Sequence, residues 1–416
     1  MFKRFRPIPA LGLNQYSREI WILALGRLLS AIGTGFTLFY LPIFFVNKVG
    51  LSATTVGFGV SSAALTGVAG RFLGGLWVDS EGWGRRRTLF LSLFIAGLGA
   101  LVLGISQNRW GLFGGNMLLG FGTGLYWPAT ETMVADLSKP DQRRQAYALT
   151  RLADSVGQGL GVIVGGLLIS LAEVYRWLFI GDGISFWIFL GLVYVLLPET
   201  AAPGATGKPG WGAWKQAITD RRLLLYALVN CQITGYIALM INTLPLYLKN
   251  FADQGQGISE LQISIFFTLN LIFSVLLQIP TAKFLQRYRY AQALGISLLF
   301  WGLGFAGVAT ASRLPGLTYP GTGLAMLLLA IATVSYTPVA SALVVELAPH
   351  NLRGVYLSIN SQCWAVGYFV GPAIGGIAMD LNQPWVDGFW LIMVTSIGLG
   401  FVLLRWLDRW MKSGPR

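Results

Sequence analysis

The stretch YWPATETMVADLSKPDQR at residues 126–143 recurs, in the same register, as YTPVASALVVELAPHNLR at residues 336–353. The residues that coincide include Tyr126 with Tyr336, Pro128 with Pro338, Asp136 with Glu346 and Arg143 with Arg353. The same frame then pairs Gly157, Gly161, Gly165 and Gly166 with Gly367, Gly371, Gly375 and Gly376. These matches predict two parallel copies of one structural unit, as in membrane proteins whose halves rock about a central site.

The composition indicates where such a chain resides. Of its 416 residues, 54% are hydrophobic and 11% are charged, and the mean hydropathy is +0.62. Soluble domains carry roughly 25% charged residues, and the apolar blocks of this chain reach the roughly 20 residues that a helix needs to cross a bilayer. We predict an all-α integral membrane protein with twelve transmembrane helices at 20–46, 53–79, 87–106, 110–136, 144–171, 177–197, 222–249, 258–283, 290–311, 319–347, 352–380 and 387–410.

One long segment rich in Pro, Gly and Ala separates the sixth predicted helix from the seventh. Such a composition is typical of a linker. The expected domains are an N-terminal six-helix bundle at 1–197, a cytoplasmic linker at 198–220 and a C-terminal six-helix bundle at 221–416. The basic start MFKRFR precedes an apolar run too long for the core of a signal peptide, so we interpret it as leading into a retained first helix.

Lysine and arginine are distributed unevenly among the loops. They gather at both chain ends and in alternate loops, whereas each of the other loops carries a single basic residue. The positive-inside rule then places both termini in the cytoplasm and the helices in the cell (inner) membrane. The net charge of +13 is therefore mostly a signal of topology. We expect no nucleic-acid partner, because no basic soluble domain is present to bind one.

The segment GGLWVDSEGWGRRR at 74–87 resembles the loop between helices 2 and 3 of the major facilitator superfamily. The resemblance implies that family's fold, two pseudo-symmetric six-helix bundles, and gives its conformational roles to Gly75, Asp79, Gly84, Arg85 and Arg86. The loop departs from the family pattern, because a serine follows the aspartate and two extra residues precede Gly84.

A second motif resembles the drug/proton antiporter branch of that family. GYFVGPAIGG at 367–376 is similar to the glycine and proline motif that such antiporters carry in helix 5, although here it lies in helix 11. The helix 5 counterpart has Val162 where proline is expected, and Asn116 stands where drug antiporters commonly carry arginine. We expect Gly161, Gly371 and Pro372 to permit conformational change, with close helix packing as the alternative.

The charged loop also suggests a latch between the halves. Asp79 is expected to lie near the start of helix 11, around Leu352, whose free N–H groups carry a partial positive charge. Held by Arg85 or Arg86, it would fasten the two halves in the outward-open state. The alternative is that these arginines only anchor the topology.

Charges inside predicted helices point to function, because each is costly in a bilayer. Arg151 and Asp154 are three residues apart and are expected to pair on one helix face. We predict proton coupling through Asp154 or Glu131, with Arg151 or Arg27 competing for the carboxylate; a purely structural ion pair is the alternative. Asp182 lies near the outer end of its helix, where access to water is expected to explain it.

The resemblance implies a central cavity between helices 1, 4, 7 and 10. Polar and aromatic side chains on these helices and on helix 11 suit a partly apolar organic molecule. The candidates for lining this cavity are Thr34, Tyr126, Trp127, Asn230, Gln232, Tyr236, Tyr336, Asn360 and Gln362.

Several chemistries are excluded by what the chain lacks. His350 is the only histidine, and Cys231 and Cys363 are far apart in sequence, so we expect no metal site, no cofactor and no enzymatic nucleophile. No phosphate-binding loop is present. We therefore predict a monomeric secondary transporter that moves a small organic solute, with proton-coupled efflux as the leading interpretation. Uptake of a metabolite, by symport or facilitated diffusion, and a membrane sensor without transport stay open, as does the identity of the substrate.

Overall fold

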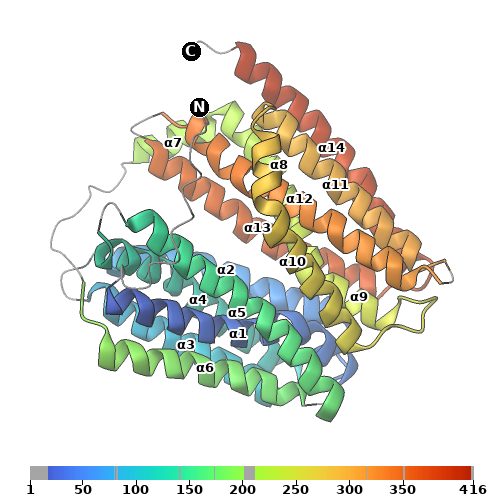
Figure 1. Ribbon diagram of the computed structural model, residues 1–416, viewed down its shortest axis with the longest axis horizontal. Coiled ribbons are helices and arrows are strands. Elements are labelled where there is room, and N and C mark those ends of the chain that lie inside the picture. Colours follow the sequence, from blue (N-terminus) through green and yellow to red (C-terminus); the bar gives the residue numbers. More distant parts are fainter. Residues whose placement is uncertain are drawn as a thin grey trace, which may run out of the picture.

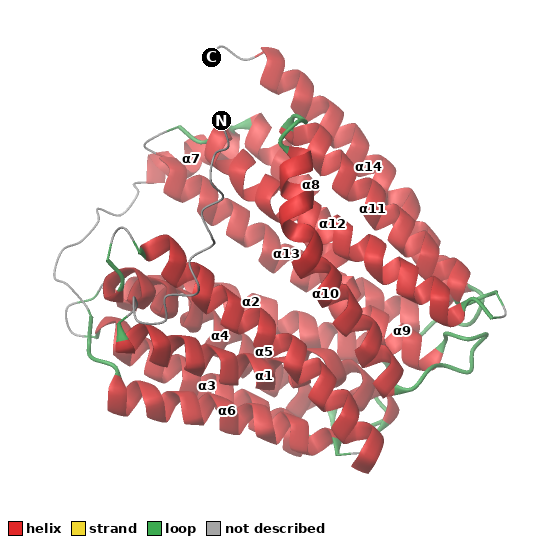
Figure 2. Cartoon of the chain, viewed as in Figure 1, coloured by secondary structure: helices red, strands yellow, loops and turns green. Residues whose placement is uncertain are grey.

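The computed structural model describes residues 17–78, 80, 83–139, 142–172, 174–200, 211–314, 316–349 and 352–413. Twelve long helical segments follow one another in this part of the chain, with ends within three residues of the predicted ones. Ten of them are long and apolar enough to cross a membrane. No strand occurs among these residues, as Figure 2 shows. The all-α membrane fold predicted from the sequence is confirmed.

The first half of the chain forms one bundle of six helices. Local signals set several of their ends: the Ser17 side chain accepts a hydrogen bond from the N–H of Ile20, and Asn108 accepts one from Gly111, as N-cap residues do. The helices are α1 (Arg18–Asn47), α2 (Ala53–Val78), α3 (Gly84–Ile105), α4 (Arg109–Leu137), α5 (Arg143–Ala172) and α6 (Tyr175–Leu196).

The second half forms the other bundle, preceded by a short helix that the linker prediction did not include, α7 (Trp211–Thr219). The seventh long segment is interrupted near its middle by a π-helical turn at Leu239–Thr243. Pro245 follows this turn and lacks the N–H that a regular helix would use, which accounts for the irregularity. The elements are α8 (Arg221–Ala238), η2 (Leu239–Thr243), α9 (Leu244–Asn250), α10 (Glu260–Leu285), α11 (Tyr290–Ala311), α12 (Thr318–Leu347), α13 (Arg353–Met379) and α14 (Trp385–Ser413).

The two bundles meet at one end and diverge at the other (Figure 1). They approach each other near α9 and separate toward the end where α7 lies. We call this second end the basic face, because α3 and α8 begin there with Arg85–Arg87 and Arg221–Arg222, and α14 ends there with Arg405–Lys412. The other end, where α1 and α13 terminate and α2 begins, is the far face. Helices α2 with α13, and α5 with α10, form the main contacts between the bundles.

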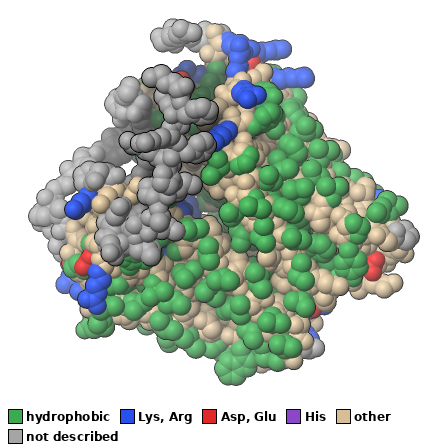
Figure 3. All heavy atoms as spheres, in the orientation of Figure 1, with side chains coloured by type: hydrophobic (Ala, Val, Ile, Leu, Met, Phe, Trp, Pro, Cys, Tyr) green, Lys and Arg blue, Asp and Glu red, His purple; other side chains and the backbone are tan. Residues whose placement is uncertain are grey.

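The outer surface of the bundles is apolar. Figure 3 shows hydrophobic side chains over most of the visible face, with Lys and Arg gathered at its upper and left margins. On α2, the exposed residues Phe58, Leu65, Phe72 and Leu76 form one stripe along the helix. Since a soluble protein rarely exposes so broad an apolar area, this surface is the one that contacts lipid.

Candidate functional site

Four charged side chains meet between α1, α4 and α5 and form what we call the ion-pair cluster: Arg27, Glu131, Arg151 and Asp154. Nε of Arg27 donates to Oδ1 of Asp154 at 3.0 Å, and Nη2 donates to Oδ2. Nη1 of Arg27 lies 3.6 Å from Oε1 of Glu131, which also lies 3.0 Å from Nη2 of Arg151. The two carboxylates and two guanidinium groups therefore balance in charge.

The four side chains of the ion-pair cluster differ in their exposure. The exposed fraction of the side chain falls from 58% for Arg151 to 29% for Glu131, 14% for Asp154 and 0% for Arg27. The ring of Trp127 lies beside both guanidinium groups, 5.4 Å from Cζ of Arg27 and 4.8 Å from Cζ of Arg151, within the range of cation–π attraction. The exposure of the charged side chains therefore decreases stepwise from Arg151 to Arg27.

The predicted pairing of Arg151 with Asp154 is wrong. Both residues lie on α5, but Arg27 of α1 donates to both oxygens of Asp154 in a fork. The side chain of Arg151 turns to Glu131 on α4 instead. Spacing along one helix could not reveal which neighbouring helix supplies the better partner.

A second polar cluster lies in the C-terminal bundle, between α8, α12 and α13. Asn360 accepts hydrogen bonds from Tyr226 at 2.6 Å and from Nδ2 of Asn230 at 2.9 Å, and Tyr336 donates to Oδ1 of Asn230. The ring of Trp364 lies 6.2 Å from that of Tyr336. We call these five residues the amide–tyrosine cluster. The sequence had pointed to Asn230, Tyr336 and Asn360, but not to Tyr226.

Gln232 and Tyr236 do not join the amide–tyrosine cluster, although both were expected in the same cavity. Nε2 of Gln232 donates to the carbonyl of Ser396 at 2.7 Å and to the hydroxyl of Tyr236 at 2.6 Å, and the ring of Tyr236 packs against Trp301. Two residues along a helix correspond to about 200° of rotation, so Gln232 faces α14 while Asn230 faces α13. Gln232 and Tyr236 therefore contact α14 and α11, away from the amide–tyrosine cluster.

The remaining cavity candidates lie beside one cluster or the other. Tyr126 is buried next to Trp127, with ring centroids 5.5 Å apart. The hydroxyl of Thr34 donates to the carbonyl of Ser30 at 2.9 Å and so is turned toward its own helix. Gln362 is half-buried on α13. Trp127 is thus the aromatic candidate with direct contact to the ion-pair cluster.

Asp182 is fully buried between α1 and α6, so the expected access to water is wrong. The hydroxyl of Thr37 donates to its Oδ2, and Oδ1 has no hydrogen-bond partner among the described residues. No cation of the described residues forms an ion pair with it. Since an isolated buried carboxylate is very costly, we expect this side chain to be neutral.

Asp182→Asn is expected to shift the apparent melting temperature of the purified protein by less than about 4 °C, because an amide replaces a neutral carboxyl at about the same size. Asp182→Lys should prevent folding. Thermal unfolding in detergent measures both. An Asn variant that unfolds as readily as the Lys variant would show that Asp182 carries a charge.

Polar contacts hold the two bundles together at the far face. The carboxylate of Asp380, at the end of α13, accepts hydrogen bonds from the N–H groups of Ala53 at 2.8 Å and Thr54 at 2.7 Å, and so caps α2 of the other bundle. Asn47 and Asn250 exchange two hydrogen bonds through their amides, at 2.8 and 2.9 Å. No motif in the sequence indicated these links, because each joins residues from different halves.

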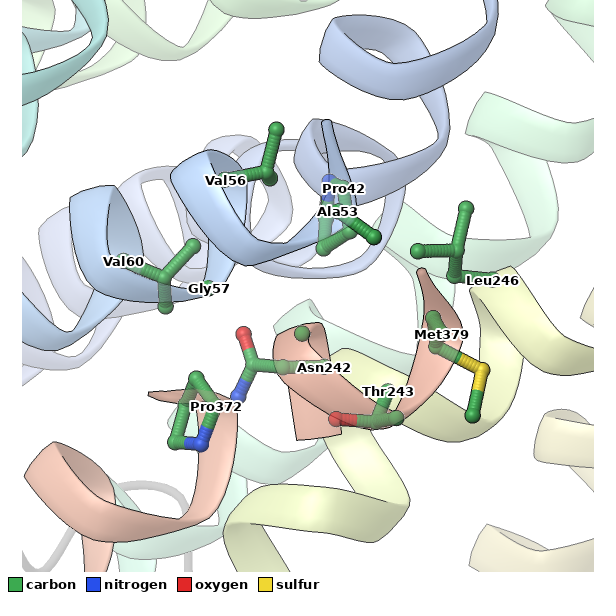
Figure 4. Close-up of a pocket in the computed structure, with 11 residues that line it drawn as sticks. Pro42, Ala53, Val56, Gly57, Val60, Asn242, Thr243, Leu246, Pro372 and Met379 are labelled. Carbon is green, nitrogen blue, oxygen red and sulfur yellow. The ribbon is translucent and has the colours of Figure 1, made fainter. Parts of the chain in front are cut away.

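Close backbone contact reinforces the far face. A Cβ atom added to Gly57 would lie 2.2 Å from the carbonyl oxygen of Pro372, and one added to Gly376 would lie 3.0 Å from Cα of Gly57. Figure 4 shows the crevice beside this contact, with Gly57 and Val60 on one side and Pro372, Asn242 and Thr243 on the other. The approach of α2 to α13 therefore depends on glycine.

Comparison with known proteins identifies the family. The family model described as the Major Facilitator Superfamily matches residues 23–255 and 238–415. The chain belongs to the Major Facilitator Superfamily. Members of this superfamily are transporters, so the chain is a multi-pass membrane transporter of small molecules and not an enzyme.

Relatives in the superfamily align along almost the whole chain. The "Multidrug resistance protein MdtH" of Aeromonas hydrophila is 24% identical over 394 residues, covering 92% of this chain and 94% of that protein. The "Uncharacterized MFS-type transporter YttB" of Bacillus subtilis is 24% identical over 401 residues, covering 95% and 96%. The name of the first of these relatives agrees with the expected resemblance to the drug-transporting branch.

Solved structures of superfamily transporters share the fold. The nucleoside transporter NupG superposes with a TM-score of 0.78 at 16% identity, over 96% of this chain and all of that one. A bacterial homologue of the lysosomal transporter Spinster, in an inward-facing and occupied conformation, superposes with a TM-score of 0.76 at 14% identity, over 94% of this chain and 96% of that one.

The family loop between α2 and α3 is tied to its own bundle. Gly84 has a φ of +79° and lies against the carboxylate of Glu199, which accepts hydrogen bonds from the N–H groups of Arg85 and Arg86. The guanidinium of Arg85 pairs with Asp136 at the end of α4. Positive φ at this position explains why the superfamily motif requires glycine there.

The predicted latch involves Asp79, which lies outside the described residues. Gly75, in the preceding turn, has open space where a Cβ would be. The latch therefore stays a prediction, and it applies to a state in which the bundles close at the basic face, where they diverge in Figure 1.

The superfamily glycines in α5 and α13 pack helices within each bundle. A Cβ on Gly161 would lie 2.2 Å from the carbonyl oxygen of Ile32 on α1, and one on Gly371 would lie 2.8 Å from the carbonyl oxygen of Gly235 on α8. These are equivalent positions of the two repeats. The geometry favours close packing as their role, whereas Pro372 lies at the contact between the bundles.

The two cysteines are adjacent despite their separation in sequence. The hydroxyl of Thr234 donates to the carbonyls of Cys231 at 3.1 Å and Cys363 at 2.9 Å, and the two thiols are in contact. Distance along the chain was therefore a poor guide to their placement, because α8 and α13 pack closely at Gly367.

Proposed function

We propose that the chain exports a small, partly apolar organic compound in exchange for protons. The observation that carries this proposal is the ion-pair cluster, in which two carboxylates share two arginines inside membrane-spanning helices. Each such charge costs roughly 2.5–3.5 kcal/mol at the bilayer centre on insertion scales, so four of them together are expected to have a function. Relatives named multidrug resistance proteins support an amphipathic substrate.

The graded exposure of the ion-pair cluster supports a route for the proton. Glu131 is the more accessible carboxylate, and Asp154 lies deeper, against fully buried Arg27. Protonation of Asp154 removes the charge that holds Arg27 in its fork, so Arg27 then depends on Glu131 alone. A proton bound here thus changes the contacts between α1, α4 and α5, which is the coupling that an antiporter needs.

Alternating access follows from the two faces. The positive-inside rule assigns the basic face to the cytoplasm, so a structure joined at the far face and divergent at the basic face corresponds to an inward-open state. Substrate would enter from the cytoplasm and bind between the ion-pair cluster and the amide–tyrosine cluster. Outward opening would then require the hydrogen bonds of Asp380 and Asn250 to break.

The experiment that tests this function uses purified protein in liposomes with an imposed pH gradient. Proton flux is followed while lipophilic cations, organic acids and sugars are added in turn. Wild type and Asp182→Asn are expected to show flux evoked by one of these classes. Asp154→Asn should lose most of it, since an amide cannot take up and release a proton as a carboxylate does.

The outcomes separate the alternatives. Flux that Asp154→Asn retains at the wild-type rate would overturn the assignment of Asp154 and reduce it to a structural partner of Arg27. Compound uptake driven in the same direction as the proton would indicate symport rather than export. Binding without any flux would favour a sensor.

A further inference from the structure

Arg71 is a membrane-embedded cation that the proton route does not use. It lies on α2 seven residues before Val78, which places it about 10 Å inside the helix end. Its one polar contact with the described residues is a hydrogen bond from Nη1 to Oγ of Ser361, at 3.3 Å. A guanidinium carries five N–H donors, so most of the hydrogen-bonding capacity of Arg71 is unused.

The side chain of Arg71 projects away from lipid. The exposed stripe of α2 runs through Leu65, Phe72 and Leu76, and at 100° per residue Arg71 lies roughly 120° around the helix from the centre of that stripe. On this inner side α2 contacts α4 through Gly70 and α13 through Ser361. Arg71 therefore lies where α2 meets α4 and α13, and both of these helices carry candidate cavity residues.

The charges inside the membrane are distributed unequally between the halves. In the C-terminal bundle, Asp, Glu, Lys and Arg lie in the loops or toward the helix ends, and the segments between them, at 223–248, 261–282, 290–312, 316–345, 355–379 and 388–404, contain none. In the N-terminal bundle, both carboxylates of the ion-pair cluster are occupied by Arg27 and Arg151. A cationic compound would find neither of these two carboxylates free, and the remaining membrane-embedded carboxyl group, Asp182, is fully buried, whereas an acidic compound would find Arg71.

We propose that the transported compound carries an acidic group, a carboxylate or a sulfonate, and that Arg71 binds it. A carboxylate or sulfonate accepts two hydrogen bonds from one guanidinium, which would replace the single weak bond to Ser361. The amide–tyrosine cluster then contacts the neutral, aromatic part of the same molecule. This inference rests on the proposed transport function, but it concerns the charge of the substrate and not the coupling ion or the direction.

The test compares two fluorescent probes that share a ring system, anionic anilinonaphthalene sulfonate and neutral N-phenylnaphthylamine. Full-length protein in phosphatidylcholine nanodiscs is titrated with each probe at one pH, with empty nanodiscs as background. Wild type is expected to bind the sulfonate more tightly than the neutral probe. Arg71→Gln should weaken sulfonate binding by about tenfold to a hundredfold, as for loss of a charge-assisted pair, and leave the neutral probe within about twofold.

Two further variants separate binding from a structural role. Arg71→Lys retains the charge and should lose less sulfonate affinity than Arg71→Gln. Ser361→Ala removes the hydrogen bond between Arg71 and α13 but leaves the guanidinium, and it should bind the sulfonate at least as well as wild type. Equal binding of the two probes by wild type, absence of sulfonate binding, or an equal loss in Ser361→Ala and Arg71→Gln would overturn the proposal.

The measurement is independent of the liposome experiment. Probe binding is at equilibrium and requires neither a pH gradient nor flux. If proton-coupled export fails but wild type still prefers the sulfonate, the acidic character of the substrate stands and the export proposal falls. If export is observed but the sulfonate is not preferred, the export proposal stands and the role of Arg71 falls.

Discussion

Arg27→Leu is expected to lower the stability of the protein by about 3–5 kcal/mol and to abolish transport. Arg27 is fully buried and donates to both oxygens of Asp154. Removal of the guanidinium leaves Asp154 without its cation in a nearly closed site, and the cost of an unpaired buried charge exceeds the cost of losing the pair. The apparent melting temperature in detergent, and the monodisperse fraction on size exclusion, measure the loss.

The double variant Arg27→Leu/Asp154→Leu provides the matched control. It removes both charges together, so we expect it to recover most of the stability while transport stays lost. That combination would separate the structural contribution of the ion pair from its part in proton coupling. A single variant as stable as wild type would contradict the geometry of the ion-pair cluster, and a double variant that transports would contradict its proposed function.

Gly57→Leu is expected to prevent closure of the far face and to stop transport. Even one carbon at this position would lie 2.2 Å from the carbonyl oxygen of Pro372, and the position of each atom is fixed by a helix backbone, which cannot move aside as a flexible side chain does. Overpacking of this kind costs about 1–3 kcal/mol. The cost falls only on the state in which α2 and α13 are in contact, so the population shifts by roughly fivefold to 150-fold toward the open far face.

Accessibility of the crevice in Figure 4 measures this shift. In a background with both native cysteines replaced by serine, Val60→Cys is labelled with a membrane-impermeant maleimide added from the far face. Labelling should be faster in Gly57→Leu than in the parent. Gly114→Leu is the control, since a Cβ at Gly114 meets nothing within 4 Å. Unchanged labelling in Gly57→Leu would contradict the proposed role of this contact.

The sequence allowed the charged residues of the candidate site to be predicted, but not which of them form ion pairs with one another. Arg27, Glu131, Arg151 and Asp154 could be found because charge within apolar segments is conspicuous in a sequence. Their pairing could not, since Asp154 had a plausible partner three residues away and a better one on α1.

The face of a helix posed a similar problem. Asn230 and Gln232 are both polar and two residues apart, and the sequence alone offered no reason to separate them. Only the packing of α8 against α13 on one side and α14 on the other gives them different surroundings. Asp182 was misjudged for the same reason, because nearness to a helix end does not reveal what covers a side chain.

The sequence by itself determined the number and position of the helices, their division into two related halves and the orientation expected in the membrane. These properties follow from segment length, apolar content and the placement of Lys and Arg, all of which are local along the chain. Only the tertiary structure decided which side chains meet: Arg27 with Asp154, Asp380 with the start of α2, and Arg71 with Ser361. Each of these contacts joins helices that are distant in sequence, and the rotation and depth of each helix depend on how its neighbours pack against it.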